Sequence, residues 1–247
     1  MGKRHFDMHG IVKLAAASAA LLLLAAPALA ETRTIEVPAF SALDVSSGID
    51  AIVTVGGAQS ITAEAKDKRL LDDLQLKVEG GTLKAYYDWS FFDIFSFGDR
   101  DQIKLTIALP ALSRVEASAG ADVEATGVTG DALKFSSSSG ADLMLRAVAG
   151  KSIDLNASSG AGLKIEGSCE DGKANSSSGS NLEADKLLCA TMDANSSSGS
   201  DLDVYASKSI KANASSGSDL TIYGNPPEVD QESSSGSDIK IENWAPI

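Results

Sequence analysis

An alternation of apolar and polar positions recurs seven times between residues 113 and 243. Each copy contains a Ser-rich phrase around a glycine, and successive glycines are 18 to 20 residues apart. The third and fifth positions after each glycine are apolar in every copy, whereas the second and fourth positions before it are polar. The glycines of the seven copies are Gly120, Gly140, Gly160, Gly179, Gly199, Gly217 and Gly236. The pattern indicates one structural unit repeated in tandem.

Apolar residues at every second position are typical of strands that bury one face. The glycine between two such runs predicts a corner, where the backbone takes a positive φ or passes close to another segment. A unit of this length is short for a pair of helices and cannot bury its apolar face alone. We therefore predict an all-β fold, a parallel β-helix whose rungs of 18 to 20 residues stack about 4.8 Å apart.

Stacking would turn each repeated position into a ladder that runs along the molecule. The fourth position before the glycine is asparagine in four successive copies, and we expect these side chains to form an amide ladder. They are Asn156, Asn175, Asn195 and Asn213. The residue directly before each glycine is Ala119 in the first copy and serine in the other six. It continues the alternation, so we expect it on the inward side, where buried hydroxyls would need hydrogen-bond partners.

The first thirty residues have the pattern of a signal peptide. Lys3, Arg4 and Lys13 provide a positive start, residues 14–27 are almost wholly Ala and Leu, and residues 28–30 supply small residues for cleavage. The apolar run is short for a membrane span, which takes about 20 residues, and no second such run follows. We expect a protein that is exported and has no membrane span in its mature chain.

The remaining residues, 31–247, are predicted to form a single β-helix domain. It would have an irregular N-terminal part over 31–112 and tandem repeats over 113–243. Loss of three basic residues and one acidic residue with the signal changes the formal net charge from −13 to −15. Such a charge argues against nucleic acid and anionic lipid as partners, since both need clustered Lys and Arg. Both histidines lie in the signal, which removes the commonest general base and metal ligand from the mature chain.

Aspartate recurs two positions after the glycine, at Asp122, Asp142, Asp201, Asp219 and Asp238, with Asp50 upstream. Gly162 and Asn181 interrupt this column. Asp201, Asp219 and Asp238 fall on three successive copies, where stacked carboxylates would repel one another or recruit a cation such as calcium. The alternative is that each aspartate caps its own corner through a bond to the backbone. Calcium is the one cofactor that the sequence brings into consideration.

Cys169 and Cys189 lie at nearly the same point of adjacent copies. Stacked rungs would bring their Cα atoms within the range of a disulfide. Because the exported protein meets an oxidising environment, we predict that they are joined. Two buried free thiols are the alternative.

Residues 89–97 concentrate aromatic side chains in a chain otherwise rich in small polar residues. Phe91, Phe95 and Phe97 are candidates for a cap over the open end of the β-helix core, because a solenoid needs an end cap. The alternative is an exposed aromatic tip that contacts a partner, a membrane or a ligand.

Several motifs together resemble the bacterial head GIN domain family of auto-transporter adhesins. The opening is carried by Val37–Phe40 (VPAF) and Val45–Asp50 (VSSGID), and Gly81–Ala85 (GTLKA) follows. Leu105–Leu112 (LTIALPAL) and Ser118–Val123 (SAGADV) resemble the family's central motif. The resemblance covers nearly all of the mature chain. It implies an exported β-helical protein and brings no catalytic residues.

Three classes of function remain open at this point. The first is an adhesin-like binding module that is periplasmic, at the cell surface or secreted, with a glycan or a cell-surface protein as partner. The second is a purely structural envelope protein. The third, a polysaccharide-cleaving β-helix enzyme, is disfavoured because no grouping of acids with a base recurs. The unpaired edges of a solenoid also make self-association a candidate property.

Overall fold

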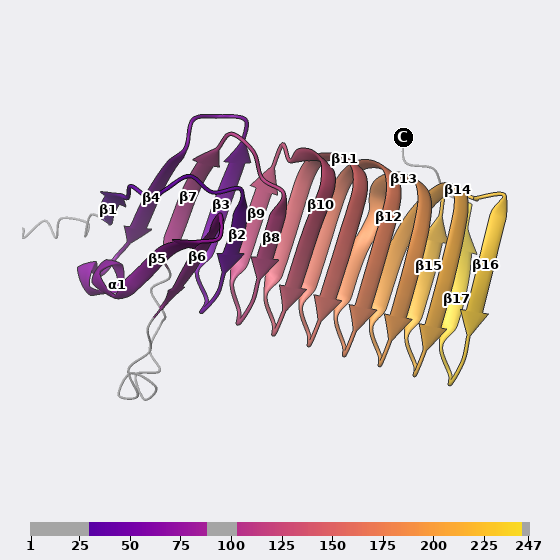
Figure 1. Cartoon of the computed structure of the whole chain (residues 1–247). Coiled ribbons are helices and arrows are strands. Elements are labelled where there is room, and N and C mark those ends of the chain that lie inside the picture. The colour runs from indigo at the N-terminus through magenta and orange to yellow at the C-terminus, as the bar shows by residue number, and fades with distance from the viewer. Residues whose placement is uncertain (1–29, 88–102, 244–247) are drawn as a thin grey trace, which may run out of the picture.

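The strands stack into a solenoid with two faces (Figure 1). The computed structural model describes residues 30–87 and 103–243. We call face A the sheet of strands that follow each glycine corner, and face B the sheet of strands that precede it. The long strands β11 to β14 bend between the faces and contribute to both. The strands of the repeats are β8 Arg114–Ala117, β9 Asp122–Thr126, β10 Thr129–Ser138, β11 Asp142–Ser158, β12 Gly162–Ser177, β13 Asn181–Ser197, β14 Asp201–Ser215, β15 Asp219–Tyr223, β16 Glu228–Ser233 and β17 Asp238–Glu242.

Every strand pair described within the repeats is parallel and joins equivalent positions of neighbouring rungs. Leu143, for example, pairs with Leu163, which pairs with Leu182, and all three are at most 2% exposed. The predicted parallel β-helix is therefore confirmed, together with its inward aliphatic columns. The core lies between the two faces and runs along the length of the solenoid.

The glycine corners are tight turns in which two successive residues have positive φ. Ser139 and Gly140 have φ of 54° and 70°, and the Ala141 N–H donates to the Ser138 carbonyl over 3.2 Å. This is the geometry of a type I′ turn. The Gly140 N–H also donates to the Ser159 carbonyl on the next rung, so the corners themselves are linked.

The expectation that the residue before each glycine faces inward was wrong. All seven of these residues are exposed, because the strand ends one residue earlier and the left-handed turn breaks the alternation. The small inward positions lie three before and one after the glycine. Ser176 and Ser180 occupy them in one rung, with their Oγ atoms 2.9 Å apart. Ser180 Oγ also donates to the Ala157 carbonyl on the preceding rung over 3.0 Å, so these buried hydroxyls are paired.

The outer surface of face B carries the predicted asparagine ladder. Asn175, Asn195 and Asn213 each donate from Nδ2 to Oδ1 of the preceding asparagine, over 3.1, 3.3 and 3.0 Å. A column of alternating charge runs beside the ladder, two residues earlier in each rung. In register it contains Lys134, Asp154, Lys173, Asp193, Lys211 and Asp230. Alternating charges attract along the stack, so this column favours the observed register.

The N-terminal part departs from simple winding. Its elements are β1 Glu31–Thr34, β2 Ala42–Val45, β3 Asp50–Val55, β4 Ser60–Ala65, α1 Lys68–Asp73, β5 Leu74–Glu79, β6 Thr82–Tyr87 and β7 Lys104–Leu109. Strand β7 lies between β3 and β4, parallel to the first and antiparallel to the second. On face B, β6 pairs with β2, and β5 forms an antiparallel hairpin with β6.

Helix α1 lies at the N-terminal end of the solenoid (Figure 1) and packs the buried Leu71 against the core. Asp67 caps the helix by accepting from the Arg69 N–H over 2.9 Å. The sequence patterns did not predict this helix. The aromatic segment 89–97, predicted to cap the core or to form a tip, lies outside the described residues, as does most of the expected signal peptide.

Candidate functional site

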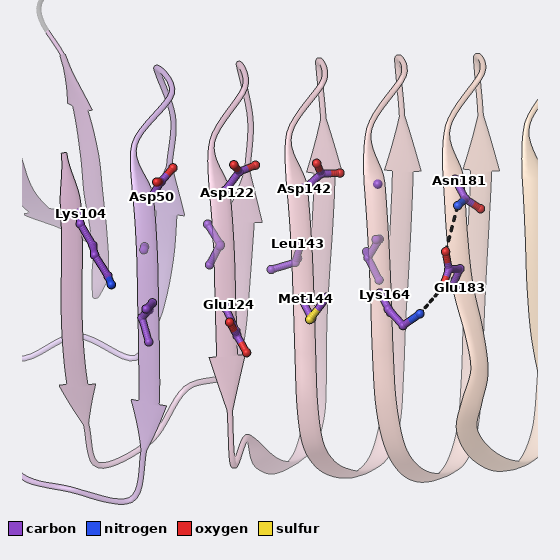
Figure 2. A pocket seen from close by; sticks show the side chains of 15 residues that line it. Asp50, Lys104, Asp122, Glu124, Asp142, Leu143, Met144, Lys164, Asn181 and Glu183 are labelled. Atoms are coloured by element: carbon purple, nitrogen blue, oxygen red, sulfur yellow. Dashed lines mark hydrogen bonds and ion pairs between the residues drawn. The ribbon is translucent and has the colours of Figure 1, made fainter. Parts of the chain in front are cut away.

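A groove of about 580 Å³ crosses the outer surface of face A, from β7 through β3, β9, β11 and β12 to β13 (Figure 2). Apart from Ala51, Val123, Leu143 and Leu163, which are buried, its lining residues occupy equivalent outward positions of successive rungs. They form a row of mainly acidic residues near the turns and a second row with a more mixed character. The residues are Asp50, Ala51, Ile52, Lys104, Asp122, Val123, Glu124, Asp142, Leu143, Met144, Gly162, Leu163, Lys164, Asn181 and Glu183.

The first row contains three aspartates stacked in register. Asp122 pairs with Asp50 on one side and with Asp142 on the other. Burial is the main cause that raises the pKa of Asp122, and the charge of Asp142 raises it further. Burial also raises the pKa of Asp50, with a contribution from Asp122 and a partial offset from Lys104. Among the described residues, Oδ1 of Asp50 is buried and has no hydrogen-bond partner. The row therefore presents acceptors whose negative charge is incompletely neutralised.

Gly162 opens the row between Asp142 and Asn181. A Cβ atom at this position would lie 2.2 Å from Oδ1 of Asp142, so the carboxylate of Asp142 occupies the space that a side chain would need. Figure 2 shows this gap between the two labelled side chains. This contact would involve only the end of the flexible Asp142 side chain. A larger residue at position 162 would therefore displace the Asp142 carboxylate and fill part of the groove.

The second row combines apolar and charged side chains. Ile52 is 37% exposed and Met144 is partly exposed, and Glu124 lies between them in register. Lys164 donates to Glu183, and this bond lowers the pKa of Glu183. Asn181 donates to the other oxygen of Glu183 over 3.2 Å. The end of the groove that contains Lys164, Asn181 and Glu183 is therefore ordered by side-chain hydrogen bonds. The end that contains the three stacked aspartates is open to a ligand.

The groove holds five carboxylates and two lysines. Carboxylates accept hydrogen bonds from hydroxyl and amine groups. Acceptors that repeat at strand spacing suit a ligand that itself repeats along its length.

The sequence prediction placed a calcium site at the other end of the aspartate column. Asp201, Asp219 and Asp238 do stack in register there. Among residues 30–87 and 103–243, however, no group of three or more His, Cys, Asp or Glu residues is arranged to hold a metal ion. Calcium binding at these aspartates stays a prediction. The alternative, in which each aspartate accepts a hydrogen bond from the backbone of its own corner, also stays a prediction.

Cys169 and Cys189 are register partners on β12 and β13. The structure joins them in a disulfide with their Cα atoms 4.4 Å apart. This bond links two adjacent rungs at a point away from the groove.

Sequence reasoning missed the groove although it identified the aspartate column. It favoured the run from Asp201 to Asp238 because that run is unbroken, whereas the groove lies where Gly162 interrupts the column. The absence of a side chain at Gly162 was the feature of the sequence that could have indicated the groove. The presence of Ile52 and Lys104 in the groove could not be predicted, because it depends on the order of the N-terminal strands. No repeat indicates that order.

The fold and the groove define a class of protein, a parallel β-solenoid with an elongated surface groove on one face. Residues 39–226 match the model of the family described as "Putative auto-transporter adhesin, head GIN domain". The chain belongs to this family, so the resemblance inferred from the sequence motifs is confirmed. None of the curated proteins compared with the chain matches it.

Solved structures with this fold come from several bacteria. A "putative adhesin" from Bacteroides fragilis NCTC 9343 superposes with a TM-score of 0.78 at 20% identity, over 87% of this chain and 97% of that chain. A "putative lipid binding protein" from Parabacteroides distasonis ATCC 8503 gives 0.66 at 18%, over 87% and 97%. A "putative adhesin" from Parabacteroides merdae ATCC 43184 gives 0.62 at 13%, over 87% and 96%. At these identities the likeness shows the shared fold alone.

The only helix in the described part of the chain, α1, spans six residues. No helix in that part has the length and apolar character that crossing a membrane requires.

Proposed function

We propose that the protein is an exported, adhesin-like binding module of the cell envelope that acts by binding and not by catalysis. The groove on face A is its binding surface. The observation that carries this proposal is the stack of Asp50, Asp122 and Asp142, whose carboxylates repeat at strand spacing along an open groove that also exposes apolar side chains. Membership of an adhesin family and the signal-like N-terminus support the cell-envelope setting.

A glycan is the partner class that this surface suits best. Sugar hydroxyls donate to carboxylates, and the apolar faces of sugar rings can cover Ile52 and Met144. Because the groove crosses successive rungs, it accommodates a chain of sugars more readily than a single one. An uncharged or cationic glycan is favoured, since anionic groups would meet the aspartate row.

The test is binding of the mature protein to a glycan array, once with calcium and once with a chelator. We expect saturable binding to one class of glycan. The variant Asp122→Asn/Asp142→Asn should lose it, because the hydrogen-bonding strength of ionised acceptors exceeds that of neutral ones. Asp201→Asn/Asp219→Asn is the matched control, since it changes the same column on the same face outside the groove.

The control variant also separates the calcium prediction from the groove. Loss of binding in chelator and in the Asp201→Asn/Asp219→Asn variant, with the Asp122→Asn/Asp142→Asn variant unaffected, would move the site to the calcium candidate. Absence of binding by the folded wild-type protein in both conditions would contradict the proposal and favour a structural role.

A further inference from the structure

The C-terminal end of the solenoid finishes in two edge strands (Figure 1). Among the described strands, β16 pairs only with β14, and β17 pairs only with β15. One side of each strand therefore carries backbone N–H and C=O groups that no described strand satisfies. Such an edge is a template for a further strand.

The core is uncovered at the same end. Val229 is 38% exposed and Ile241 is 45% exposed, although they continue the inward columns of the preceding rung. Their register partners Ile210 and Ile222 are 3% and 0% exposed. At the opposite end of the molecule, α1 packs Leu71 onto the core. A strand added to the C-terminal edge would cover Val229 and Ile241, whose equivalents in the preceding rung are already buried.

The outward side of β16 is strongly acidic. Glu228, Asp230 and Glu232 alternate along it, opposite Ser209, Lys211 and Asn213 of β14. In the column of alternating charge on face B, a lysine precedes each aspartate, and Asp230 is the last member. The next rung in that order would carry a base. Glu228 and Glu232 add a carboxylate on each side of Asp230, and these also favour basic residues on a neighbouring strand.

This charge selects among the strands that could occupy the edge. A second copy of the protein that paired β16 with β16 would place carboxylates against carboxylates, and like charges on opposed strands are destabilising. A strand with Lys or Arg at alternate positions would instead pair with all three acids. An apolar residue between the bases would cover Val229.

The backbone has the orientation that such pairing needs. The N–H of Ser234 donates to the Ala214 carbonyl of the preceding rung over 3.1 Å. Backbone groups of a parallel strand point alternately to either neighbour. The N–H of Gln231, three residues earlier, therefore points to the open side, where it is available to a partner.

We propose that β16 is a docking edge for an extended segment of a partner protein, with basic residues alternating around apolar ones. The proposal is independent of the face A groove, because β16 lies on the other face and at the end of the molecule. Main-chain bonds to the edge would supply affinity, and the acids would supply specificity.

The test uses the full mature protein and a labelled eight-residue peptide that alternates Lys and Val, followed by fluorescence polarisation at about 0.15 M salt. Three control peptides accompany it: one with Glu in place of Lys, one with the four lysines grouped together, and one with D-residues. Saturable binding of the alternating Lys peptide alone is expected. Equal binding of the grouped peptide would overturn the proposal, because it would show attraction without strand pairing.

Three protein variants locate the site. Glu228→Gln/Asp230→Asn/Glu232→Gln should weaken binding by about tenfold or more, since three charge-assisted contacts are lost. Asp154→Asn/Asp171→Asn/Asp193→Asn removes the same charge from inner rungs of face B and should change affinity by no more than about twofold. Gln231→Pro removes the N–H on the open side, a change that edge strands tolerate, and should abolish binding while circular dichroism reports an intact fold.

Equal losses in the two triple variants would overturn the proposal in favour of non-specific attraction. A large gain in affinity on removal of residues 244–247 would overturn it in favour of the chain's own terminus as the occupant. Concentration-dependent dimers that exclude the peptide and vanish with Gln231→Pro would overturn it in favour of a second copy.

Discussion

Asn175 donates a hydrogen bond from Nδ2 to Oδ1 of Asn156 on the preceding rung, over 3.1 Å. The bond repeats at Asn195 and Asn213, so each inner amide both donates and accepts. The ladder ties the rungs together on the outer surface of face B.

Replacement of an inner member of this ladder should destabilise the protein. Asn175→Ala leaves an acceptor on Asn156 and a donor on Asn195 without partners, at a cost of about 1 kcal/mol in the free energy of unfolding. Ser136→Ala is the matched control, because Ser136 occupies the same column and takes no part in the amide bonds. Urea unfolding of both variants provides the comparison, and equal midpoints would show that the ladder adds no stability.

The corners should be sensitive to backbone strain and not to crowding. Gly140 has a φ of +70° and open space where an alanine methyl group would lie, so Gly140→Ala should cost about 1 to 2 kcal/mol through φ alone. Gly167→Ala should cost more, because its Cβ would lie 2.0 Å from the Val148 carbonyl oxygen. Denaturant midpoints rank the two variants, and the reverse order would refute this assignment of strain.

The aspartate row should make stability depend on pH in a defined direction. The folded-state pKa of Asp122 is raised above 3.8, so ionisation of this group opposes folding. That penalty is absent well below pH 3.8 and develops as the pH rises through the folded pKa. Asp122→Asn should therefore stabilise the protein at pH 7 and have little effect at pH 3.

Glu183→Gln provides a control of opposite sign. Its pKa is lowered by the bond from Lys164, so its contribution to stability is present above pH 4.5 and is lost as the pH falls through the folded pKa. This variant should be destabilised at pH 7. Unfolding of both variants at the two pH values tests the signs, and two shifts in the same direction at pH 7 would conflict with the structure.

Removal of the disulfide should weaken the fold without altering its register. Cys169→Ala/Cys189→Ala loses a crosslink between adjacent rungs and should reduce the unfolding free energy by about 3 kcal/mol. Thiol titration of the unfolded wild-type protein should find no free groups. Two titratable thiols in protein purified without reductant would show that the bond does not form.

The repeats allowed much of the fold to be predicted from the sequence. Leu143 and Leu163 face inward because the third position after each glycine has the same place in the apolar–polar alternation in every copy. Tandem stacking aligns these positions into one column of the core. The amide ladder followed for the same reason. Ser139 was misplaced because alternation holds only within a strand, and its φ of 54° lies in the turn.

The remaining features depend on contacts that no repeat encodes. The insertion of β7 between β3 and β4 brings Lys104 beside Asp50, but residues 31–112 have no periodic pattern from which this order follows. Helix α1 is six residues long, too short to show a helical period. The groove passes Gly162, which lacks a side chain, but it also depends on Lys104 and Asp50, which come from strands outside the repeats.

Hydrogen exchange of the mature protein, free and saturated with a glycan selected on the array, would locate the binding surface directly. We predict added protection confined to the strands that line the groove, which are β7, β3, β9 and the face A portions of β11, β12 and β13, with the glycan recovered intact. Protection elsewhere on the solenoid, or recovery of a cleaved glycan, would contradict the proposal of a non-catalytic binding groove on face A.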